Sequence, residues 1–295
     1  MALDKKAAAQ KANFTNYAYT MFDTGLLQPE PGDLTSAGYD LLFWINGKDF
    51  STKTFYGYIA VSKSNPGEYV LAVRGTRTFQ EWLLDFAVLP VPFQGAHNGG
   101  FVALGFHGIF ETLEFIEKAT GEVMSLTHAA GKLANVKSLL VTGHSLGAAL
   151  ATLTGAFLAL NNTAGLKDKI DVTTFASPRV GLLDFALAFN HNVKNSHRIW
   201  NVLDIVPEFP TFPFIHVNGF GDKLNQGETQ LSRLRITPQC EHNLRNHQWL
   251  LDSADFAIAG AGCDLSAAGL VGVTDGVTDG GIEAMSEALA NNGGA

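Results

Sequence analysis

The sequence predicts an α/β fold with a mostly parallel central sheet and helices on both of its faces. Three observations predict this class. Short strand-like runs alternate with longer helical patterns from residue 54 onward. The run VKSLLVTG, residues 136–143, is as apolar as a strand that is buried on both faces. A glycine-flanked serine, Ser145, follows that run directly and precedes a helical pattern.

Length, composition and charge favour one ordered domain over residues 1–295. Hydrophobic residues make up 46% of the chain and charged residues 16%, a balance typical of globular proteins and not of disordered ones. The formal charge of −8 leaves no basic stripe for a nucleic acid. No apolar run reaches the about 18 residues of a spanning helix, and the N-terminus lacks the apolar segment of a signal peptide. We therefore expect a mature secreted form or an intracellular protein, with no transmembrane segment and no nucleic-acid partner.

The expected helices and strands follow in order along the chain. Residues 5–23 place Ala8, Ala12, Tyr19 and Phe22 on one face of an amphipathic helix. Residues 54–74 form two strands around the turn SKSNPGE. The remaining expected elements are a loop with a small helix at 76–100, a helix at 108–130, a strand at 136–143, a helix at 148–162, strands at 170–178 and 197–207, and a helix at 242–258.

The C-terminal segment 264–295 is rich in Gly, Ala and Asp and is expected to pack loosely around a short helix at 281–290. Its repeated VTDG lacks the paired glycines of calcium-binding nonapeptides, so no metal site is expected there. Cys240 and Cys263 permit one disulfide in an oxidising compartment, and two buried thiols are the alternative.

The stretch around Ser145 is the main functional signal. Residues 143–147, GHSLG, fit the G-x-S-x-G pattern of a sharp turn that exposes a serine hydroxyl above a sheet. Glycine is required on both sides because side chains there would collide across the turn. An apolar strand enters the motif and small residues leave it on a helix, so the setting favours a nucleophile over a structural turn.

A nucleophilic serine needs a base that removes its proton and an acid that holds the base. Asp204 follows an apolar strand and precedes Val206-Pro207. This position puts a carboxylate at the carboxyl end of a strand, where open α/β sheets place their sites. A loop cap is the structural alternative for Asp204. The nine histidines offer several candidates for the base.

Four blocks resemble the class 3 lipases, the fungal-type triacylglycerol lipase family of α/β-hydrolases. RGTRTFQEWLLDF is similar to that family's Arg-Gly-Ser/Thr segment with its tryptophan-bearing lid, VTGHSLGAALATL to its nucleophile elbow, TFASPRVG to its Thr-Phe-Gly-Ser-Pro-Arg-Val-Gly stretch, and RIWNVLDIVPEFP to its acid-bearing strand. The blocks run in the family's order. Two positions depart from the pattern, because His107-Gly108-Ile109-Phe110 replaces His-x-Gly-Phe and Ala176 replaces a glycine.

The resemblance implies an α/β-hydrolase fold with Ser145 as nucleophile and Asp204 as acid. It implies oxyanion donors at Thr76, through its backbone N–H and hydroxyl, and at the backbone N–H of Leu146.

For the base, the resemblance favours His242, because HNLRNH is similar to a bacterial His-Ser-x-x-x-Tyr pattern. His247, read as His-x-Trp, is the alternative. His216 is similar to the family's histidine behind the site and is expected to support it rather than to act as base.

The segment from Thr78 to Pro90 is expected to be a lid. Phe79, Trp82, Leu83 and Phe86 make it too apolar to lie exposed without a reason. As a lid it would cover the site in water and turn its apolar face to a lipid–water interface. An ordinary core helix is the alternative.

The resemblance thus implies a carboxylic ester hydrolase acting on acylglycerols, a triacylglycerol lipase with a Ser-His-Asp triad and no metal or organic cofactor. A soluble-substrate esterase, of the feruloyl esterase or phospholipase A1 type, is the alternative among enzymes. A non-catalytic, hydrolase-like binding module is the alternative outside them.

Overall fold

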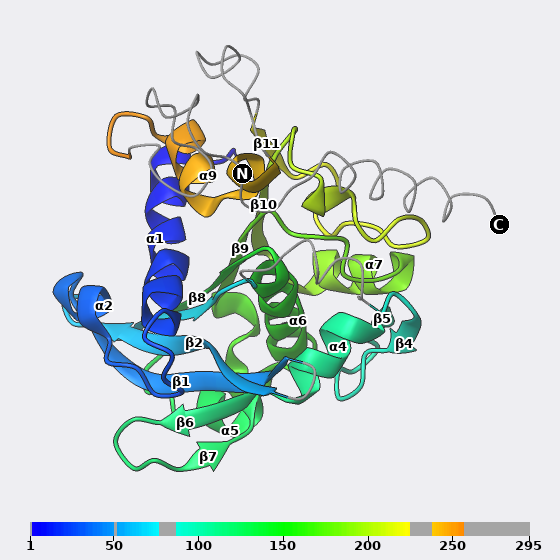
Figure 1. Ribbon diagram of the computed structural model, residues 1–295. Helices are drawn as coiled ribbons and strands as arrows, with labels where there is room; N and C mark the ends of the chain where they lie inside the picture. Colours follow the sequence, from blue (N-terminus) through cyan, green and yellow to red (C-terminus); the bar gives the residue numbers. More distant parts are fainter. Residues whose placement is uncertain (1, 50–51, 77–86, 225–237, 257–295) are drawn as a thin grey trace.

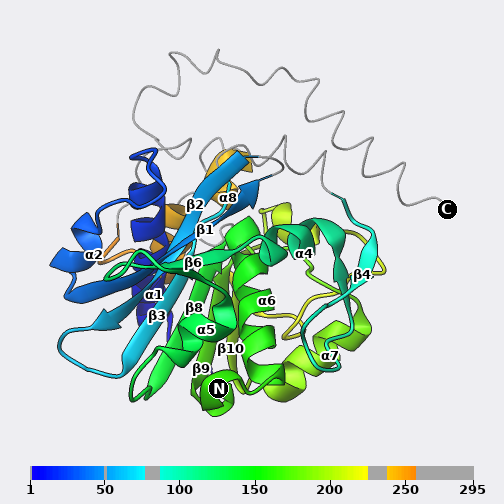
Figure 2. The same ribbon diagram turned by 90° about the horizontal axis from the view of Figure 1, so that it is seen from below.

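A nine-stranded sheet forms the centre of the molecule, with the strand order β11-β10-β9-β8-β3-β2-β1-β6-β7 (Figure 1). The computed structural model describes residues 2–49, 52–76, 87–224 and 238–256. A second sheet pairs only β4 (Pro90–Pro92) with β5 (Phe101–Ala103). Helices cover both faces of the large sheet (Figure 2), as expected for the predicted α/β class.

One half of the sheet is parallel. It contains β3 (Glu68–Val73), β8 (Ser138–His144), β9 (Ile170–Phe175), β10 (Asn195–Asn201) and β11 (Asp222–Leu224). Because parallel strands end at the same edge, the residues that follow them are brought together there. Thr76, Ser145 and Asp204 follow β3, β8 and β10, so the topology collects three predicted site residues at one edge.

The other half of the sheet is antiparallel and was only partly predicted. It contains β1 (Tyr39–Asp49), β2 (Thr52–Ser62), β6 (Glu114–Glu117) and β7 (Val123–Met124). The predicted hairpin at 54–74 is confirmed, since β2 pairs antiparallel with β3. β1 was not predicted.

The single helix expected at 108–130 is wrong. This segment contains the end of α4 (Leu104–Glu111), then β6 and β7, and then α5 (Leu126–Gly131). β1 offers a free edge, and β6 pairs with it through Phe43↔Glu117 and the neighbouring positions. Phe115 and Ile116 are consequently buried in different core clusters, which two consecutive strand residues achieve by pointing to opposite faces.

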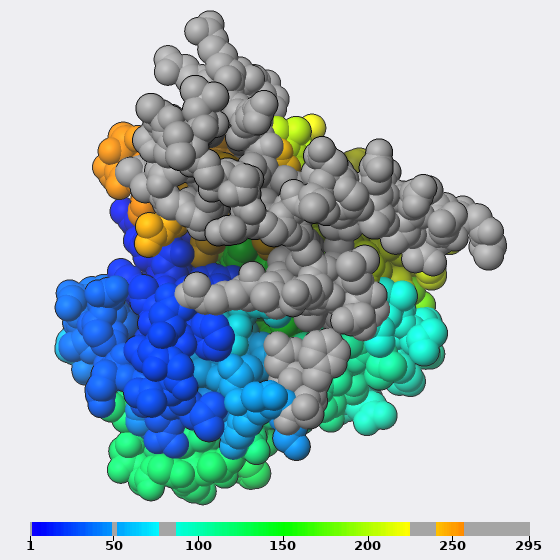
Figure 3. All heavy atoms as spheres, viewed as in Figure 1, coloured from blue at the N-terminus to red at the C-terminus, as the bar shows by residue number. Residues whose placement is uncertain are grey.

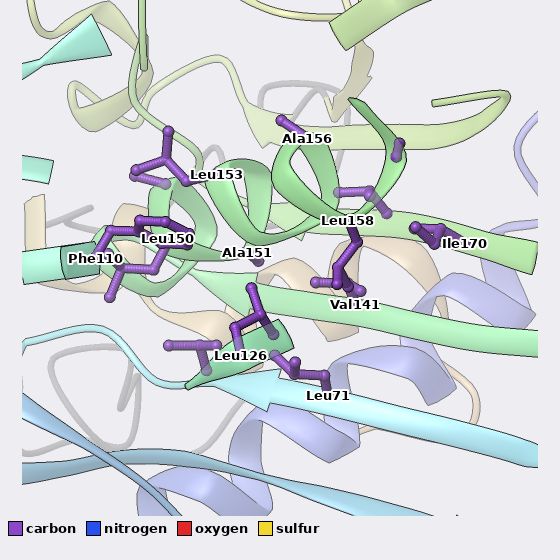
Figure 4. Packing of buried hydrophobic residues seen from close by; sticks show 14 of the residues in the cluster. Leu71, Phe110, Leu126, Val141, Leu150, Ala151, Leu153, Ala156, Leu158 and Ile170 are labelled. Atoms are coloured by element: carbon purple, nitrogen blue, oxygen red, sulfur yellow. The ribbon is translucent and has the colours of Figure 1, made fainter. Parts of the chain in front are cut away.

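One face of the sheet is covered by α4, α5, α6 (Leu146–Leu160) and α7 (Leu183–Asn192). The helix α6 is buried along nearly its whole length, against β3, β8 and β9. Figure 4 shows side chains of α6, among them Leu158, packed with Val141 of β8 and Leu71 of β3. This contact fixes the start of α6, and with it Ser145, relative to the strands. The predicted helix at 148–162 is confirmed, whereas α7 was not predicted.

The opposite face is covered by α1 (Lys5–Phe22), which packs on β2, β3 and β8 and against α9 (Leu244–Leu251). The predicted helix at 5–23 is confirmed. Figure 3 shows α1 in dark blue on the molecular surface, next to the orange atoms of the segment 238–256. Gln248 of α9 fastens the two helices, because its Nε2 donates to the carbonyl of Ala9 at 3.0 Å and its Oε1 accepts from Asn16 at 2.7 Å.

The helix expected at 242–258 is interrupted. A short helix α8 (Pro238–His242) precedes it, and Asn243 then caps α9 by accepting the backbone N–H of Arg245 at 2.9 Å. The helix ends at Leu251. This break separates His242 from the helix that carries His247. The remaining short helices are α2 (Gly32–Ser36), η1 (Thr163–Gly165), η2 (Lys167–Lys169) and η3 (Val206–Glu208).

Several predictions fall outside the described residues. They concern the lid residues Phe79, Trp82, Leu83 and Phe86, the segment 264–295, and Cys263. Cys240 is buried in α8. Across the described ranges, every helix is too short or too polar to cross a bilayer.

Candidate active site

Ser145 lies at the turn between β8 and α6. Its backbone adopts φ +58° and ψ −129°, a conformation that L-residues rarely take. The turn is held by a hydrogen bond from the Ser145 N–H to the carbonyl of Phe175 at 3.0 Å. A Cβ atom at Gly143 would lie 2.2 Å from the carbonyl oxygen of Gly147, so the expected collision across the turn is present.

The side chains of Ser145, His242 and Asp204 form one hydrogen-bonded chain. His242 Nδ1 lies 2.9 Å from Asp204 Oδ2, and His242 Nε2 lies 2.7 Å from Ser145 Oγ. Because a carboxylate can only accept, Nδ1 carries the proton, and Nε2 is left to accept the serine hydroxyl. This is the arrangement that a serine nucleophile requires.

The acid is buried and held by its own loop. The side chain of Asp204 is fully buried, and its Oδ1 accepts the backbone N–H of Val206 at 3.0 Å. Asn201, at the end of β10, donates from Nδ2 to the carbonyl of Glu241 at 3.2 Å. The acid strand and the segment before the base are therefore connected directly.

Glu241 is a neighbour of the triad that sequence reasoning missed. Burial and the charge of Asp204 raise the pKa of its carboxyl to about 7. The local sequence around Glu241 carries no sign of this shift in pKa, because burial and the charge of the distant Asp204 both arise only in the folded structure.

His247 lies apart from the triad. It is completely buried, and its Nδ1 donates to the carbonyl of Asn243 at 3.0 Å. Within the described ranges its Nε2 has no hydrogen-bond partner. Of the two histidines considered for the base, the structure brings His242 to Ser145 and leaves His247 inside α9.

The other histidines of the predicted region have structural partners. His216 donates from Nε2 to the carbonyl of Pro207 at 2.7 Å, and burial together with the charges of Arg198 and Arg179 lowers its pKa to about 3. It therefore braces the loop that follows Asp204, consistent with the expected supporting role. His107 is buried in α4 and accepts the backbone N–H of Gln94 at 3.2 Å.

Thr76 lies at the end of β3, next to the elbow. A Cβ atom at Gly75 would come within 2.9 Å of the Ser145 Cβ, so this backbone runs directly alongside the serine. The Thr76 hydroxyl is buried and finds no hydrogen-bond partner among the described residues. An unused donor beside a serine can serve a ligand oxygen. Leu146 begins α6 and is fully buried.

Arg74 holds this strand end and was not predicted as a site residue. Its Nη1 donates to the carbonyl of Gly75 at 2.6 Å and its Nε to the carbonyl of Phe55 at 2.8 Å. The guanidinium also lies 3.6 Å from the centroid of the Phe22 ring. The Arg-Gly motif could have indicated this role, because a buried guanidinium must donate its N–H groups to nearby carbonyls.

Ala176 is the position where the resemblance predicts glycine. It has φ +52° and is fully buried. Glycine adopts this conformation without strain, so the structure explains the family's preference. The described residues include no group of three or more His, Cys, Asp or Glu side chains that could hold a metal ion.

Residues 70–214 match the family model for lipase (class 3). The chain is 31% identical over 163 residues to Lipase ZK262.3 of Caenorhabditis elegans, covering 55% of this chain and 43% of the relative. It is 29% identical over 236 residues to Phospholipase A1-II 3 of Oryza sativa subsp. japonica, covering 71% and 56%. The chain thus spans about half the length of these curated relatives.

Among solved structures, the chain is similar to a triacylglycerol lipase whose catalytic centre is a serine protease triad. The TM-score is 0.57 at 20% identity, and the match covers 80% of this chain and 91% of that chain. At this identity the likeness concerns the fold, and it agrees with the predicted α/β-hydrolase architecture. Residues 70–214, which contain all four motif blocks, thus belong to the class 3 lipase family.

Proposed function

We propose that this protein is a carboxylic ester hydrolase, with Ser145 as nucleophile, His242 as base and Asp204 as acid. The observation that carries the proposal is the hydrogen-bonded chain from Ser145 Oγ through His242 to Asp204, at 2.7 and 2.9 Å. The family and the strained turn at Ser145 support it. Both features are typical of serine hydrolases.

In this mechanism, Ser145 attacks the ester carbonyl while His242 Nε2 takes its proton. The Asp204 carboxylate holds the imidazole and stabilises the imidazolium that forms. Thr76 and the N–H of Leu146 are the proposed donors to the developing oxyanion. His242 then protonates the leaving alcohol, and a water molecule releases the acyl group by the reverse sequence.

The proposed substrates are acylglycerols at a lipid–water interface. The family and the triacylglycerol lipase of similar fold support this choice. Leu89 and Phe212 are 66% and 89% exposed, near the C-terminal end of the expected lid segment and on the loop beyond Asp204. Apolar side chains this exposed favour an apolar partner. The lid itself, with Phe79, Trp82, Leu83 and Phe86, remains a prediction from the sequence.

A phospholipase A1 activity is the second candidate. The observation that favours it is the rice Phospholipase A1-II 3, which matches 71% of this chain, more than the nematode lipase does. The two candidates share the same triad and differ only in the group that the ester joins to the acyl chain.

Two measurements test these proposals. Labelling with an organophosphonate tests the nucleophile, because wild type should become covalently modified and Ser145→Ala should not. A wild-type protein that resists the reagent would contradict the enzyme proposal and favour a binding module. Rates on triacylglycerol emulsions and phosphatidylcholine vesicles then separate lipase from phospholipase. With a short-chain ester, a jump in rate at its solubility limit supports an interfacial lid, and a smooth curve supports a soluble-substrate esterase.

A further inference from the structure

A second series of hydrogen bonds reaches the site from α1. The backbone N–H of Gly75 donates to Tyr19 Oη at 2.9 Å. The same hydroxyl lies 2.9 Å from His144 Nδ1, and His144 Nε2 lies 2.7 Å from the backbone carbonyl oxygen of His242. The series thus touches the residue before Thr76, the residue before Ser145, and the base itself.

The hydrogen-bonding groups fix which nitrogen of His144 carries the proton. The carbonyl of His242 can only accept, so Nε2 must donate. A neutral imidazole with a proton on Nε2 has a lone pair on Nδ1, which must accept. The Tyr19 hydroxyl already accepts from Gly75, and its single proton is directed to Nδ1. The opposite tautomer would set two lone pairs against each other 2.7 Å apart.

The surroundings of His144 keep it uncharged. It is buried between α1 and the C-terminal segment, and burial lowers its pKa well below the ordinary value. The charges of His242 and His247 act in the same direction. A neutral neighbour is suitable here, because the ring centroids of His144 and His242 are 4.6 Å apart and a second positive charge would oppose the imidazolium formed in the reaction.

On the basis of the proposed function, we propose that Tyr19 and His144 are positioning residues for the base. The Tyr19 hydroxyl holds His144 in the tautomer that donates to the His242 carbonyl, and this bond keeps His242 Nε2 within reach of Ser145 Oγ. Gln248 supplies a second connection between α1 and the segment that carries the base. Helix α1 is therefore a part of the catalytic apparatus that contributes no reacting group.

The test is Tyr19→Phe, which removes the hydroxyl and retains the ring. Tyr69→Phe is the matched control, because the Tyr69 hydroxyl also accepts a backbone N–H, from Ala134 at 3.1 Å, and donates to the Ala134 carbonyl at 2.8 Å. Misplacing a catalytic group by about 1 Å costs about 10²-fold in rate. We expect Tyr19→Phe to lower kcat and the rate of organophosphonate labelling by about 10- to 100-fold with little change in KM. Tyr69→Phe should react at the wild-type rate.

Two further measurements extend the test, and the first begins with wild type, so that part does not depend on how well Tyr19→Phe folds. In ¹⁵N-histidine NMR spectra, wild type should show His144 as a neutral imidazole protonated on Nε2, a form that His216 also adopts. The His144 signals are assigned by their absence from His144→Gln, and Tyr19→Phe should lose the His144 signature. His144→Gln keeps a donor and an acceptor but has no tautomers. In the His144→Gln background, deletion of the Tyr19 hydroxyl should therefore slow labelling less than it does in wild type.

The outcomes separate the two proposals. Labelled wild type together with an equally reactive Tyr19→Phe overturns the positioning role alone. A wild-type His144 protonated on Nδ1 does the same. A wild-type protein that is not labelled overturns the proposed function and the positioning role with it.

Discussion

A Cβ atom on Gly147 would lie 2.3 Å from the carbonyl oxygen of Val73. Helix α6 therefore begins directly against the end of β3, with no room for a side chain between them. Because Ser145 precedes this contact by two residues and Thr76 follows Val73 by three, the close approach sets the spacing between the proposed nucleophile and the proposed oxyanion donor.

Gly147→Ala tests this contact. The added methyl would meet backbone atoms of Val73 and Arg74, so it can be accommodated only by moving α6 or β3. We expect a loss of about 1–3 kcal/mol in the free energy of unfolding together with lower activity. Gly108→Ala is the control, since a Cβ there meets nothing within 4 Å in α4, and it should stabilise by up to about 1 kcal/mol. Urea unfolding checks both. A Gly147→Ala variant as stable as wild type would contradict the contact.

Thr76→Val tests the proposed oxyanion donor. Removing the hydroxyl should lower kcat by about 10²- to 10³-fold, because loss of one preorganised donor has that effect in acyl transfer, while Thr76→Ser should retain most activity. Thr142→Val is a matched control, because the Thr142 hydroxyl in β8 is also buried without a partner among the described residues. Equal kinetics for the two valine variants would exclude the Thr76 hydroxyl as an oxyanion donor.

Replacement of the two late histidines tests the base. His242→Ala should lower kcat by at least about 10³-fold, as expected for loss of a triad member. His247→Ala should retain much of the turnover of the folded protein but should lower its unfolding free energy, because it leaves a cavity in place of the buried ring and removes the hydrogen bond from Nδ1 to the Asn243 carbonyl. Steady-state kinetics and thermal unfolding separate the effects. The reverse pattern of activities would assign the base to His247.

Glu241→Gln tests the raised pKa of the Glu241 carboxyl beside the triad. The pKa of Glu241 is about 7 in the folded state against 4.5 for the free group, so the folded protein holds a proton that the unfolded chain has released. Wild-type stability should therefore fall as the pH rises from about 4.5 to about 7 and show no further loss from this group above it. The Gln variant should gain on the order of 1 kcal/mol relative to wild type across that window, after allowing for partial exposure.

Glu30→Gln, at an exposed position before α2, removes the same charge and is the control for this pH dependence. Unfolding free energies measured at several pH values give the comparison. A constant difference between Glu241→Gln and wild type across the window would contradict the raised pKa of Glu241.

Local sequence predicted four strands of the parallel half, β3, β8, β9 and β10, but not the three-residue strand β11. The apolar run before Ser145, the hairpin at 54–74 and the first helix have patterns that are complete within a few residues. β6 and β7 are different, because four and two residues form strands only where β1 supplies an edge to pair with. Their mixed apolar pattern fits a helix equally well, and the choice is made by a tertiary contact.

The site residues also divide into those that local sequence predicts and those that only tertiary contacts determine. The turn at Ser145 and the carboxylate after β10 follow from spacing, glycine and position at a strand end. His242 and His247 both fit the sequence pattern. They are separated by Asn243, which follows the last residue of α8 and caps α9, the helix that contains His247. Tyr19 and His144 are 125 positions apart, so no local pattern could have joined them.

The contact between Gln248 and Ala9 joins residues 239 positions apart. As the ribosome delivers the chain in the N-to-C direction, α1 emerges before the other described elements, and the Gln248 amide that binds it emerges 239 positions later. Ser145 and Asp204 are both translated before His242. The chemistry proposed here is therefore absent from the growing polypeptide until the segment that carries His242 has been translated.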